Sequence, residues 1–150
     1  MTAEEMWAAY RLVNPQIGEE LDAWQFGAEP DLLADLVKQG EKTATASAYD
    51  LYALADEPLP AVGERSVVLN GRGEASCVIM TTKVEVLPFN QVSADHAFKE
   101  GEGDKSLAYW RQSHEAYFTQ WLEEAGLTFS DSSQVVLEEF EVVYPLVIIA

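Results

Sequence analysis

The sequence contains one cysteine, Cys77, in 150 residues. A lone cysteine excludes an intrachain disulfide, and its position before the apolar run at 78–80 predicts a buried, unreactive thiol inside a strand. The two histidines, His96 and His114, have no further histidine or cysteine at the ligand spacing of a zinc site. We therefore expect neither a disulfide nor a structural zinc ion.

Long apolar runs are also missing. No stretch of about 18 apolar residues occurs, as a membrane-spanning helix requires. The N-terminus is acidic, whereas a secretory signal is basic and then apolar. We expect a cytoplasmic protein that has no membrane partner.

Basic residues are scarce. Nine Lys plus Arg stand against 26 Asp plus Glu, which gives a net charge of −17. This charge repels polyanions and removes the electrostatic steering that many nucleic-acid-binding proteins exploit. The composition therefore disfavours an extended duplex nucleic acid as a partner, whereas a small neutral ligand carries no such cost.

No repeat, low-complexity tract or flexible linker divides the chain. Its length and its 48% hydrophobic residues suffice for one well-buried core, so we predict a single domain over residues 1–150. Thr2 and Glu5 have the spacing of a capping box, which predicts an N-terminal helix over about residues 3–13. We expect this helix to pack on the rest of the domain.

Two further helices have recognisable ends. Leucine and valine recur at helical spacing over Asp31–Gln39, and Gly40 is placed to cap the C-terminus. The longest helix is predicted to follow Asp104 as its N-cap and to end near Gly126. Its apolar stripe predicts a packed face and comprises Leu107, Trp110, His114, Tyr117, Phe118, Trp121 and Leu122.

Four segments have the composition and alternation of strands. They are Lys42–Ser47, Ser66–Leu69, Ala75–Leu87 and about Gln134–Tyr144. The sequence Asn-Gly-Arg-Gly at 70–73 predicts a hairpin between the second and the third. Because the helices do not alternate regularly with the strands, we predict an α+β fold, a small β-barrel with peripheral helices.

Motifs for phosphate binding, zinc proteolysis and nucleophile elbows are absent. Lys42 follows the predicted end of a helix, where surface lysines are common because the helix dipole is negative there. In a cleft it would instead donate to a substrate carbonyl or act as a base. Thr45 would supply a nucleophilic hydroxyl, unless it only packs within its strand. Alternation puts Thr43 and Thr45 on one face and Lys42 on the other, unless the strand begins with a twist or a bulge.

The segment Glu100-Gly101-Glu102-Gly103-Asp104 holds three carboxylates and two glycines in five residues. It is either a solvated acidic turn or a site in which Glu100 or Glu102 faces Lys42 as a general acid. Tyr109 and Arg111 follow and could stack on a base. By contrast, the neighbouring Trp110 and His114 lie on the apolar stripe, which favours a packing role for both.

Several short motifs occur between residues 24 and 144. They are Trp24-x-Phe26-Gly27, Gly40-x-Lys42-Thr43-x-Thr45, Pro58-Leu59-Pro60, Thr81-Thr82, Pro88-Phe89, Glu100-Gly101-Glu102-Gly103-Asp104, Tyr109-Trp110-Arg111 and Phe140-Glu141-Val142-Val143-Tyr144. Taken together, these motifs resemble the ASCH domain family over about residues 24–144. That resemblance implies a PUA-like β-barrel and an activity among those linked to the family, which are RNA binding, ribonuclease activity and amide hydrolysis of acylated cytidine nucleosides.

The amidohydrolase branch of the family uses Lys-x-x-Thr and a distant glutamate that follows a His-Ala pair. The resemblance thus implies Lys42 as base, Thr45 as nucleophile and Glu100 as proton donor, with Glu102 as the other candidate. The chain departs from that branch by its N-terminal helix, a loop near residue 58 and the acidic segment at 100–104. The residues expected to bind the substrate are Thr43, Ser47, Tyr109 and Arg111.

We expect a small hydrolase that needs no cofactor and cleaves an amide on an N4-acylcytidine-like nucleoside or a similar compact substrate. One alternative is an RNA-binding module that reads short single-stranded RNA. Another is a ribonuclease with Mg²⁺ or Mn²⁺ held by Glu100, Glu102 and Asp104. A glutamate beside Lys42 would stabilise the lysine's charge and oppose its use as a base, so Lys42 would then act as a fixed cation at an oxyanion.

Overall fold

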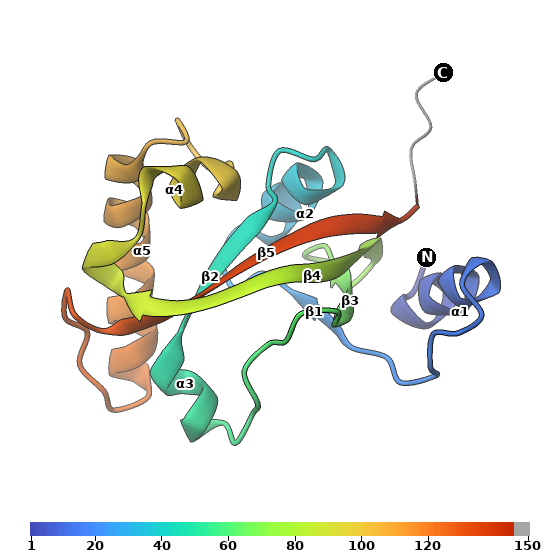
Figure 1. The fold of residues 1–150 in the computed structure, drawn as a ribbon, viewed down its shortest axis with the longest axis horizontal. Helices are drawn as coiled ribbons and strands as arrows, with labels where there is room; N and C mark the ends of the chain where they lie inside the picture. The colour runs from blue at the N-terminus through green and yellow to red at the C-terminus, as the bar shows by residue number, and fades with distance from the viewer. Residues whose placement is uncertain (146–150) are drawn as a thin grey trace.

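A five-stranded sheet, curled into a half-barrel, forms the centre of the computed structural model, which describes residues 1–145 (Figure 1). The strand order is β1-β3-β4-β5-β2, and only the β1–β3 pair is parallel. The strands are β1 (Ala23–Gln25), β2 (Ala44–Ala48), β3 (Arg65–Leu69), β4 (Ala75–Pro88) and β5 (Gln134–Tyr144). The α+β prediction is confirmed.

Five α-helices surround the sheet. They are α1 (Ala3–Val13), α2 (Pro30–Lys38), α3 (Tyr49–Leu54), α4 (Ala94–Glu100) and α5 (Leu107–Glu124). Helices α4 and α5 lie at one end of the long strands and α1 at the other (Figure 1). None of the helices within the described residues is long and apolar enough to cross a membrane.

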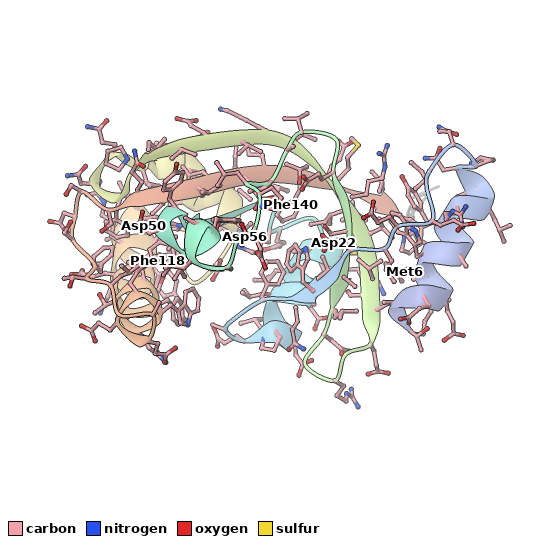
Figure 2. All side chains as sticks on the ribbon, turned by 90° about the horizontal axis from the view of Figure 1, so that it is seen from below. Met6, Asp22, Asp50, Asp56, Phe118 and Phe140 are labelled. Atoms are coloured by element: carbon pink, nitrogen blue, oxygen red, sulfur yellow. The ribbon has the colours of Figure 1, made fainter. Side chains whose placement is uncertain are left out.

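Three apolar clusters lie along the sheet, and Phe118, Phe140 and Met6 mark them in Figure 2. The first packs α4 and α5 on β2 and β5, and the second packs α2 on the centre of the sheet. The third packs α1 on β3 and β4. Helices α1, α2, α4 and α5 therefore each bury apolar residues against the sheet, and this burial is the main source of their stability.

The predicted N-terminal helix, hairpin and final strand are confirmed. Thr2 and Glu5 form both hydrogen bonds of the capping box, and β3 pairs with β4 through the predicted turn. Cys77 is buried in β4, and burial raises the pKa of its thiol to about 11. Such a thiol stays protonated and unreactive, as the sequence predicts.

Several boundaries differ from those predicted. The N-cap of α5 is Ser106, whose hydroxyl accepts a hydrogen bond from the Tyr109 amide, so the prediction of Asp104 as cap is wrong. Asp104 instead accepts from the Ser106 amide in the preceding turn. Lys42 lies before β2, which begins at Ala44. The short elements β1, α3 and α4 were not predicted, because a strand of three residues and helices of six or seven residues show too little periodicity.

Candidate functional site

Lys42 is buried although it carries an ammonium group; its side chain is only 1% exposed. Its Nζ lies 2.7 Å from a carboxylate oxygen of Glu102 and 3.2 Å from one of Glu100. The Phe26 ring, with its centroid 5.4 Å from Nζ, covers another side. Lys42 is therefore not the surface lysine that the sequence also allowed. It contacts both glutamates, whereas the sequence predicted only one of the two beside it.

Backbone contacts explain this meeting of segments that lie 58 residues apart in the sequence. The Thr43 amide donates to the carbonyl of Lys99 at 2.8 Å, which fixes the end of α4 beside the start of β2. Gly101 follows α4 with a φ of 71°, and a Cβ at this position would lie 2.3 Å from the Glu41 carbonyl oxygen. Only glycine allows this approach, so the Gly101 backbone contributes directly to the position of Glu100.

Glu100 lies at the centre of a group that we call the lysine cluster. Its members are Lys42, His96, Glu100, Glu102, Trp110 and His114. The Nε2 atom of His96 lies 2.7 Å from Oε2 of Glu100, and Trp110 Nε1 donates to the same oxygen. Lys42 and His114 approach the other oxygen, at 3.2 Å and 3.3 Å. Four groups thus surround one carboxylate, which has about four acceptor sites.

The surroundings of Glu100 favour its ionised form. Burial by itself raises the pKa of this carboxyl, but the Lys42 charge and the hydrogen bonds from His114 and His96 outweigh burial and hold the pKa well below its ordinary value. A carboxyl with this pKa releases its proton readily and rarely holds one near neutral pH. Glu100 is therefore better suited to anchoring Lys42 than to protonating a leaving group.

Stability should depend on pH through Glu100. Because its pKa is lower in the folded chain, the folded state binds fewer protons, and the stabilisation is present above the ordinary value of 4.5. As the pH falls through the folded-state pKa, that contribution is lost. We expect urea unfolding of the wild-type chain to show this loss in acid and the Glu100→Gln variant to show less of it. A Glu123→Gln variant, altered on an exposed position of α5, serves as the control; an equal pH dependence in all three chains would contradict the assignment.

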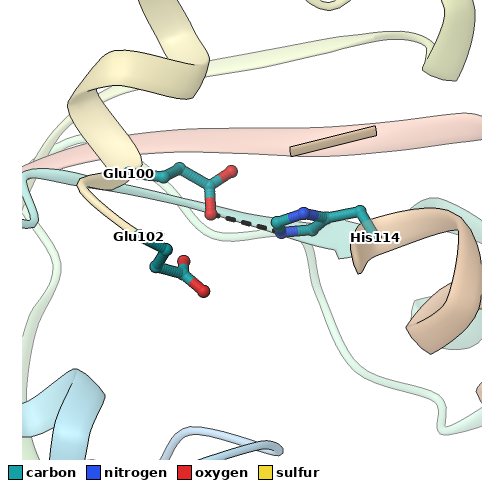
Figure 3. A group of neighbouring side chains, drawn as sticks. All are labelled: Glu100, Glu102 and His114. Carbon is teal, nitrogen blue, oxygen red and sulfur yellow. Dashed lines mark ion pairs between the residues drawn. The ribbon is translucent and has the colours of Figure 1, made fainter. Parts of the chain in front are cut away.

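His114 joins the lysine cluster from α5. Its Nδ1 donates to the Trp110 carbonyl oxygen at 2.9 Å, and its ring stacks on the indole of Trp110 with centroids 4.2 Å apart. Its Nε2 points at Glu100, as the dashed line in Figure 3 shows. Nδ1 carries the proton that it donates to Trp110. Nε2 can therefore donate to Glu100 only when the ring carries a second proton, on Nε2. The stripe residue predicted to be a satisfied histidine is indeed buried and hydrogen-bonded, and it is also a neighbour of the site.

Glu102 is the most exposed member of the lysine cluster, with a side chain 15% exposed against 8% for each histidine and 1% for Glu100. It lies below Glu100 in Figure 3, on the loop between α4 and α5. Gly101 and Gly103 flank it, both with positive φ, and Gly103 packs against the ring of Tyr109. Glu102 therefore covers Lys42 on the side that faces solvent.

A possible ligand set for a cation coincides with the lysine cluster. Ligand atoms of Glu100, Glu102 and His114 lie within 4.8 Å of one another, whereas Asp104 is exposed and hydrogen-bonded to Ser106. The Lys42 ammonium already contacts the two glutamates of this set. A metal ion there would face a like charge at close range, so the donor set fits the lysine better than it fits Mg²⁺ or Mn²⁺.

Thr45 belongs to a second polar group, which we call the strand cluster. Its members are Thr45 and Ser47 of β2, Tyr52 of α3, Thr81 of β4 and Glu138 of β5. Thr45 pairs directly with Glu138 across the antiparallel strands, and such partners share a face of the sheet. The Thr81 hydroxyl donates to Glu138 at 3.4 Å, and the hydroxyls of Ser47 and Tyr52 lie 2.6 Å apart.

The lysine cluster and the strand cluster both border the buried apolar cluster under α2. Glu138 and Phe140 lie two residues apart on β5, so their side chains share a face. Phe140 packs with Phe26 in the cluster under α2, and Phe26 contacts the ammonium of Lys42. Lys42 precedes the strand, so the alternation that separates it from Thr45 in the sequence does not apply. Both residues of the Lys-x-x-Thr motif therefore adjoin the same buried apolar cluster.

The four residues predicted to bind the substrate do not lie together in the structure. The Thr43 hydroxyl donates to the Lys99 carbonyl at 3.3 Å. Ser47 belongs to the strand cluster, and Tyr109 is 37% exposed beside the loop that carries Glu102. Arg111 is exposed and donates to the Asn90 carbonyl, on contacts separate from the lysine cluster. The structure thus brings three of the four near one cluster or the other.

The sequence did not indicate Glu138 as a site residue, it assigned His96 no role, and it favoured a packing role for Trp110. His96 and Glu100 lie four residues apart on α4, as do Trp110 and His114 on α5, and residues at this spacing share a helix face. Recognising α4 would have put His96 and Glu100 together. Glu138 gave no comparable signal, because a glutamate in a strand is ordinarily exposed.

Comparisons with known proteins agree with this fold. A model of the ASCH domain family matches residues 22–144. No curated protein sequence matches the chain significantly. The crystal structure of an ASCH domain from Lactobacillus crispatus is 37% identical, with a TM-score of 0.87 over 95% of this chain and 94% of that one.

Two further crystal structures are similar. A protein of Enterococcus faecalis is 34% identical, with a TM-score of 0.87 over 94% of this chain and 87% of that one. A mutant ASCH protein of Zymomonas mobilis is 13% identical, with a TM-score of 0.51 over 84% and 71% of the two chains, which is a likeness of fold. By the match of the family model and the two more similar structures, the chain belongs to the ASCH domain family and has its PUA-like fold.

Proposed function

We propose that this ASCH domain is a small hydrolase that cleaves an amide on an N4-acylcytidine-like nucleoside or a similarly compact substrate. The observation that carries the proposal is the buried Lys42, held by Glu100 and Glu102 next to the apolar cluster under α2 that Thr45 also adjoins. Burying charges costs several kcal/mol per ion, by order of magnitude, which apolar residues in the same place would avoid. A buried charge network in a family with known enzymes is therefore a candidate active site.

Lys42 acts in this proposal as a fixed cation rather than as a base. Two carboxylates stabilise its charge, and a charged ammonium cannot accept a proton. It suits the negative oxygen that develops when the amide carbonyl is attacked, because a preorganised cation in a dry site stabilises such an oxyanion. Glu102 moves aside or shares the ammonium as substrate enters, since it covers Lys42 on the solvent side.

Thr45 supplies the attacking hydroxyl or positions the attacking water. Its side chain is half-buried and shares a face with Glu138, a carboxylate that could take up a proton. The net charge of −17 favours an uncharged nucleoside over a polynucleotide as the substrate. These features support a compact amide substrate more than an RNA strand.

Mass spectrometry of products from a panel of acylated nucleosides and short RNAs tests the proposal. We expect the wild-type chain to convert N4-acetylcytidine to cytidine and acetate and to leave RNA intact. Binding of short single-stranded RNA without any product, weakened steeply by salt, would instead support an RNA-binding module. RNA cleavage that EDTA abolishes would support a ribonuclease.

Metal should be dispensable for the hydrolase. We expect EDTA to leave N4-acetylcytidine turnover unchanged and Mn²⁺ to leave the melting temperature unchanged, because the Lys42 ammonium contacts Glu100 and Glu102. In a Lys42→Met variant the two carboxylates and His114 lose that ammonium, so Mn²⁺ should raise the melting temperature of this variant. A rise of equal size in the wild-type chain would show that the metal and Lys42 bind together.

A further inference from the structure

A threonine nucleophile needs a partner that takes its proton and later returns one to the leaving nitrogen. Glu100 is poorly suited to this exchange. The groups around its two oxygens are the Lys42 ammonium, the Trp110 indole NH and the imidazoles of His96 and His114. A carboxylate saturated in this way has little capacity to accept a further proton.

Glu138 has the opposite surroundings. It lies directly across from Thr45 in the β2–β5 pairing, and side chains of such partners have Cβ atoms about 4.5–5.5 Å apart. Thr81 gives it a hydrogen bond at 3.4 Å, which is long, and no ion pair is recorded for it within residues 1–145. At least one of its oxygens is therefore free to exchange a proton with a neighbouring hydroxyl.

The charges that face Glu138 also favour proton uptake. Burial raises the pKa of Glu138, the hydrogen bond from Thr81 lowers it in part, and the negative charges of Glu64 and Asp22 raise it further. Tyr52, on α3, is a further titratable neighbour; burial raises the pKa of its phenol, and the charge of Glu138 raises it as well. A carboxyl with a raised pKa exchanges protons closer to neutral pH, as a general acid–base must.

We infer that Glu138 is the proton-transfer group of this site, acting on the Thr45 hydroxyl and on the leaving nitrogen of the substrate amide. This inference rests on the proposed hydrolase function. It assigns a catalytic role on β5, on the opposite face of that strand from Glu139, which contacts Lys99 and Lys83 instead. Lys42 keeps its role at the oxyanion, so the charge and the proton are handled by separate clusters.

The balanced reaction has two halves. The Thr45 oxygen bonds to the amide carbonyl carbon while its proton moves to Glu138, and the carbonyl electron pair forms an oxyanion beside Lys42. Collapse of the oxyanion breaks the C–N bond, and Glu138 gives its proton to the leaving amine. Water then attacks the acyl-threonine, its proton passes through Glu138 to the Thr45 oxygen, and the acid leaves. The sum is amide plus water giving amine plus carboxylic acid.

A pair of matched variants tests the inference by the pH dependence of kcat/KM for N4-acetylcytidine. Glu138→Gln removes the titrating group, and Glu139→Gln makes the same change at the next residue of the strand, on its other face. We expect Glu138→Gln to lose at least about 100-fold in rate, together with the acidic limb of the profile. Glu139→Gln should retain both. Glu138→Asp keeps a carboxyl on a side chain that is shorter by one methylene. This variant should retain the acidic limb of the profile, with a lower kcat/KM.

A second measurement does not depend on turnover. Carbon-detected NMR of the side-chain carboxyls, with the Glu138 signal assigned by its loss in Glu138→Gln, should show Glu138 titrating at a higher pH than exposed glutamates. Turnover by the wild-type chain with an unchanged Glu138→Gln variant would overturn the inference and leave the hydrolase standing. An inactive wild-type chain would defeat the hydrolase itself, and titration of Glu138 among the exposed glutamates would overturn this inference in either case.

Discussion

Replacing Lys42 with methionine is expected to abolish turnover of N4-acetylcytidine and to lower the free energy of unfolding by about 3–5 kcal/mol. Methionine fills much of the volume of the lysine stem but supplies no charge. Glu100, whose side chain is 1% exposed, and Glu102 then both lose the Lys42 ammonium, which lies 3.2 Å from the first and 2.7 Å from the second. The large loss of stability comes from leaving these buried carboxylates without their counter-charge.

Urea unfolding and product chromatography measure the two effects, and Lys83→Met provides the control. Lys83 also contacts two glutamates, at 3.6 Å and 3.7 Å, but its side chain is 60% exposed. Solvent screens such a pair, so we expect Lys83→Met to change stability by less than about 1 kcal/mol and to keep activity. Full activity in a folded Lys42→Met chain would rule out Lys42 as the cation at the oxyanion.

A double variant separates stability from chemistry. In Lys42→Met combined with Glu102→Gln, one of the uncompensated charges is removed together with the ammonium. We expect the double variant to recover part of the lost stability, because the two sites interact directly and their effects are not additive. It should remain inactive, since no cation is restored. Recovery of activity would show that a buried charge at position 42 is not needed for the reaction.

Replacing Gly101 with alanine is expected to cost at least about 3 kcal/mol in the free energy of unfolding. The added Cβ would lie 2.3 Å from the Glu41 carbonyl oxygen and 2.8 Å from its carbon, so the backbone itself must move. The φ of 71° adds strain of about 1–2 kcal/mol for a residue with a side chain. Because Gly101 adjoins Glu100, the same movement should displace the lysine cluster and lower activity.

Gly73→Ala is the matched control for the backbone term. Gly73 has a φ of 76°, close to that of Gly101, but a Cβ there would have no heavy atom within 4 Å. We expect Gly73→Ala to lower the free energy of unfolding only by the cost of the positive φ, about 1–2 kcal/mol, and to keep its activity. Chemical denaturation of both variants provides the measurement. Equal losses in the two would mean that the contact between Gly101 and Glu41 contributes nothing to stability.

Local patterns in the sequence were sufficient for the longer elements. The capping box at Thr2 and Glu5 predicted α1, the turn at 70–73 predicted the β3–β4 hairpin, and alternation predicted β5. Each of these signals spans only neighbouring residues of the chain, so it does not depend on what the element packs against. Short helices such as α3 and α4 were not predicted, since one or two turns provide too few residues to show the helical period.

The motif segments likewise indicated which residues to examine, but not how they are arranged. Glu100 or Glu102 was predicted to face Lys42, and both contact its ammonium. The sequence did not distinguish the roles of Glu100 and Glu102. In the structure, Glu100 is buried and holds Lys42 from within, whereas Glu102 is partly exposed and lies between Lys42 and solvent. It also placed Asp104 at the start of a helix whose cap is Ser106, because both residue types are favoured N-caps.

The sequence by itself therefore determined the family, the α+β class, the longer elements and the two polar segments that meet at the site. Only the tertiary structure decided that His96, Trp110 and His114 surround Glu100, and that Glu138 lies across from Thr45. The physical reason is the range of the interactions. Capping, alternation and turn formation act between residues a few positions apart, whereas burial and cross-strand register depend on contacts between segments that the sequence separates by dozens of residues.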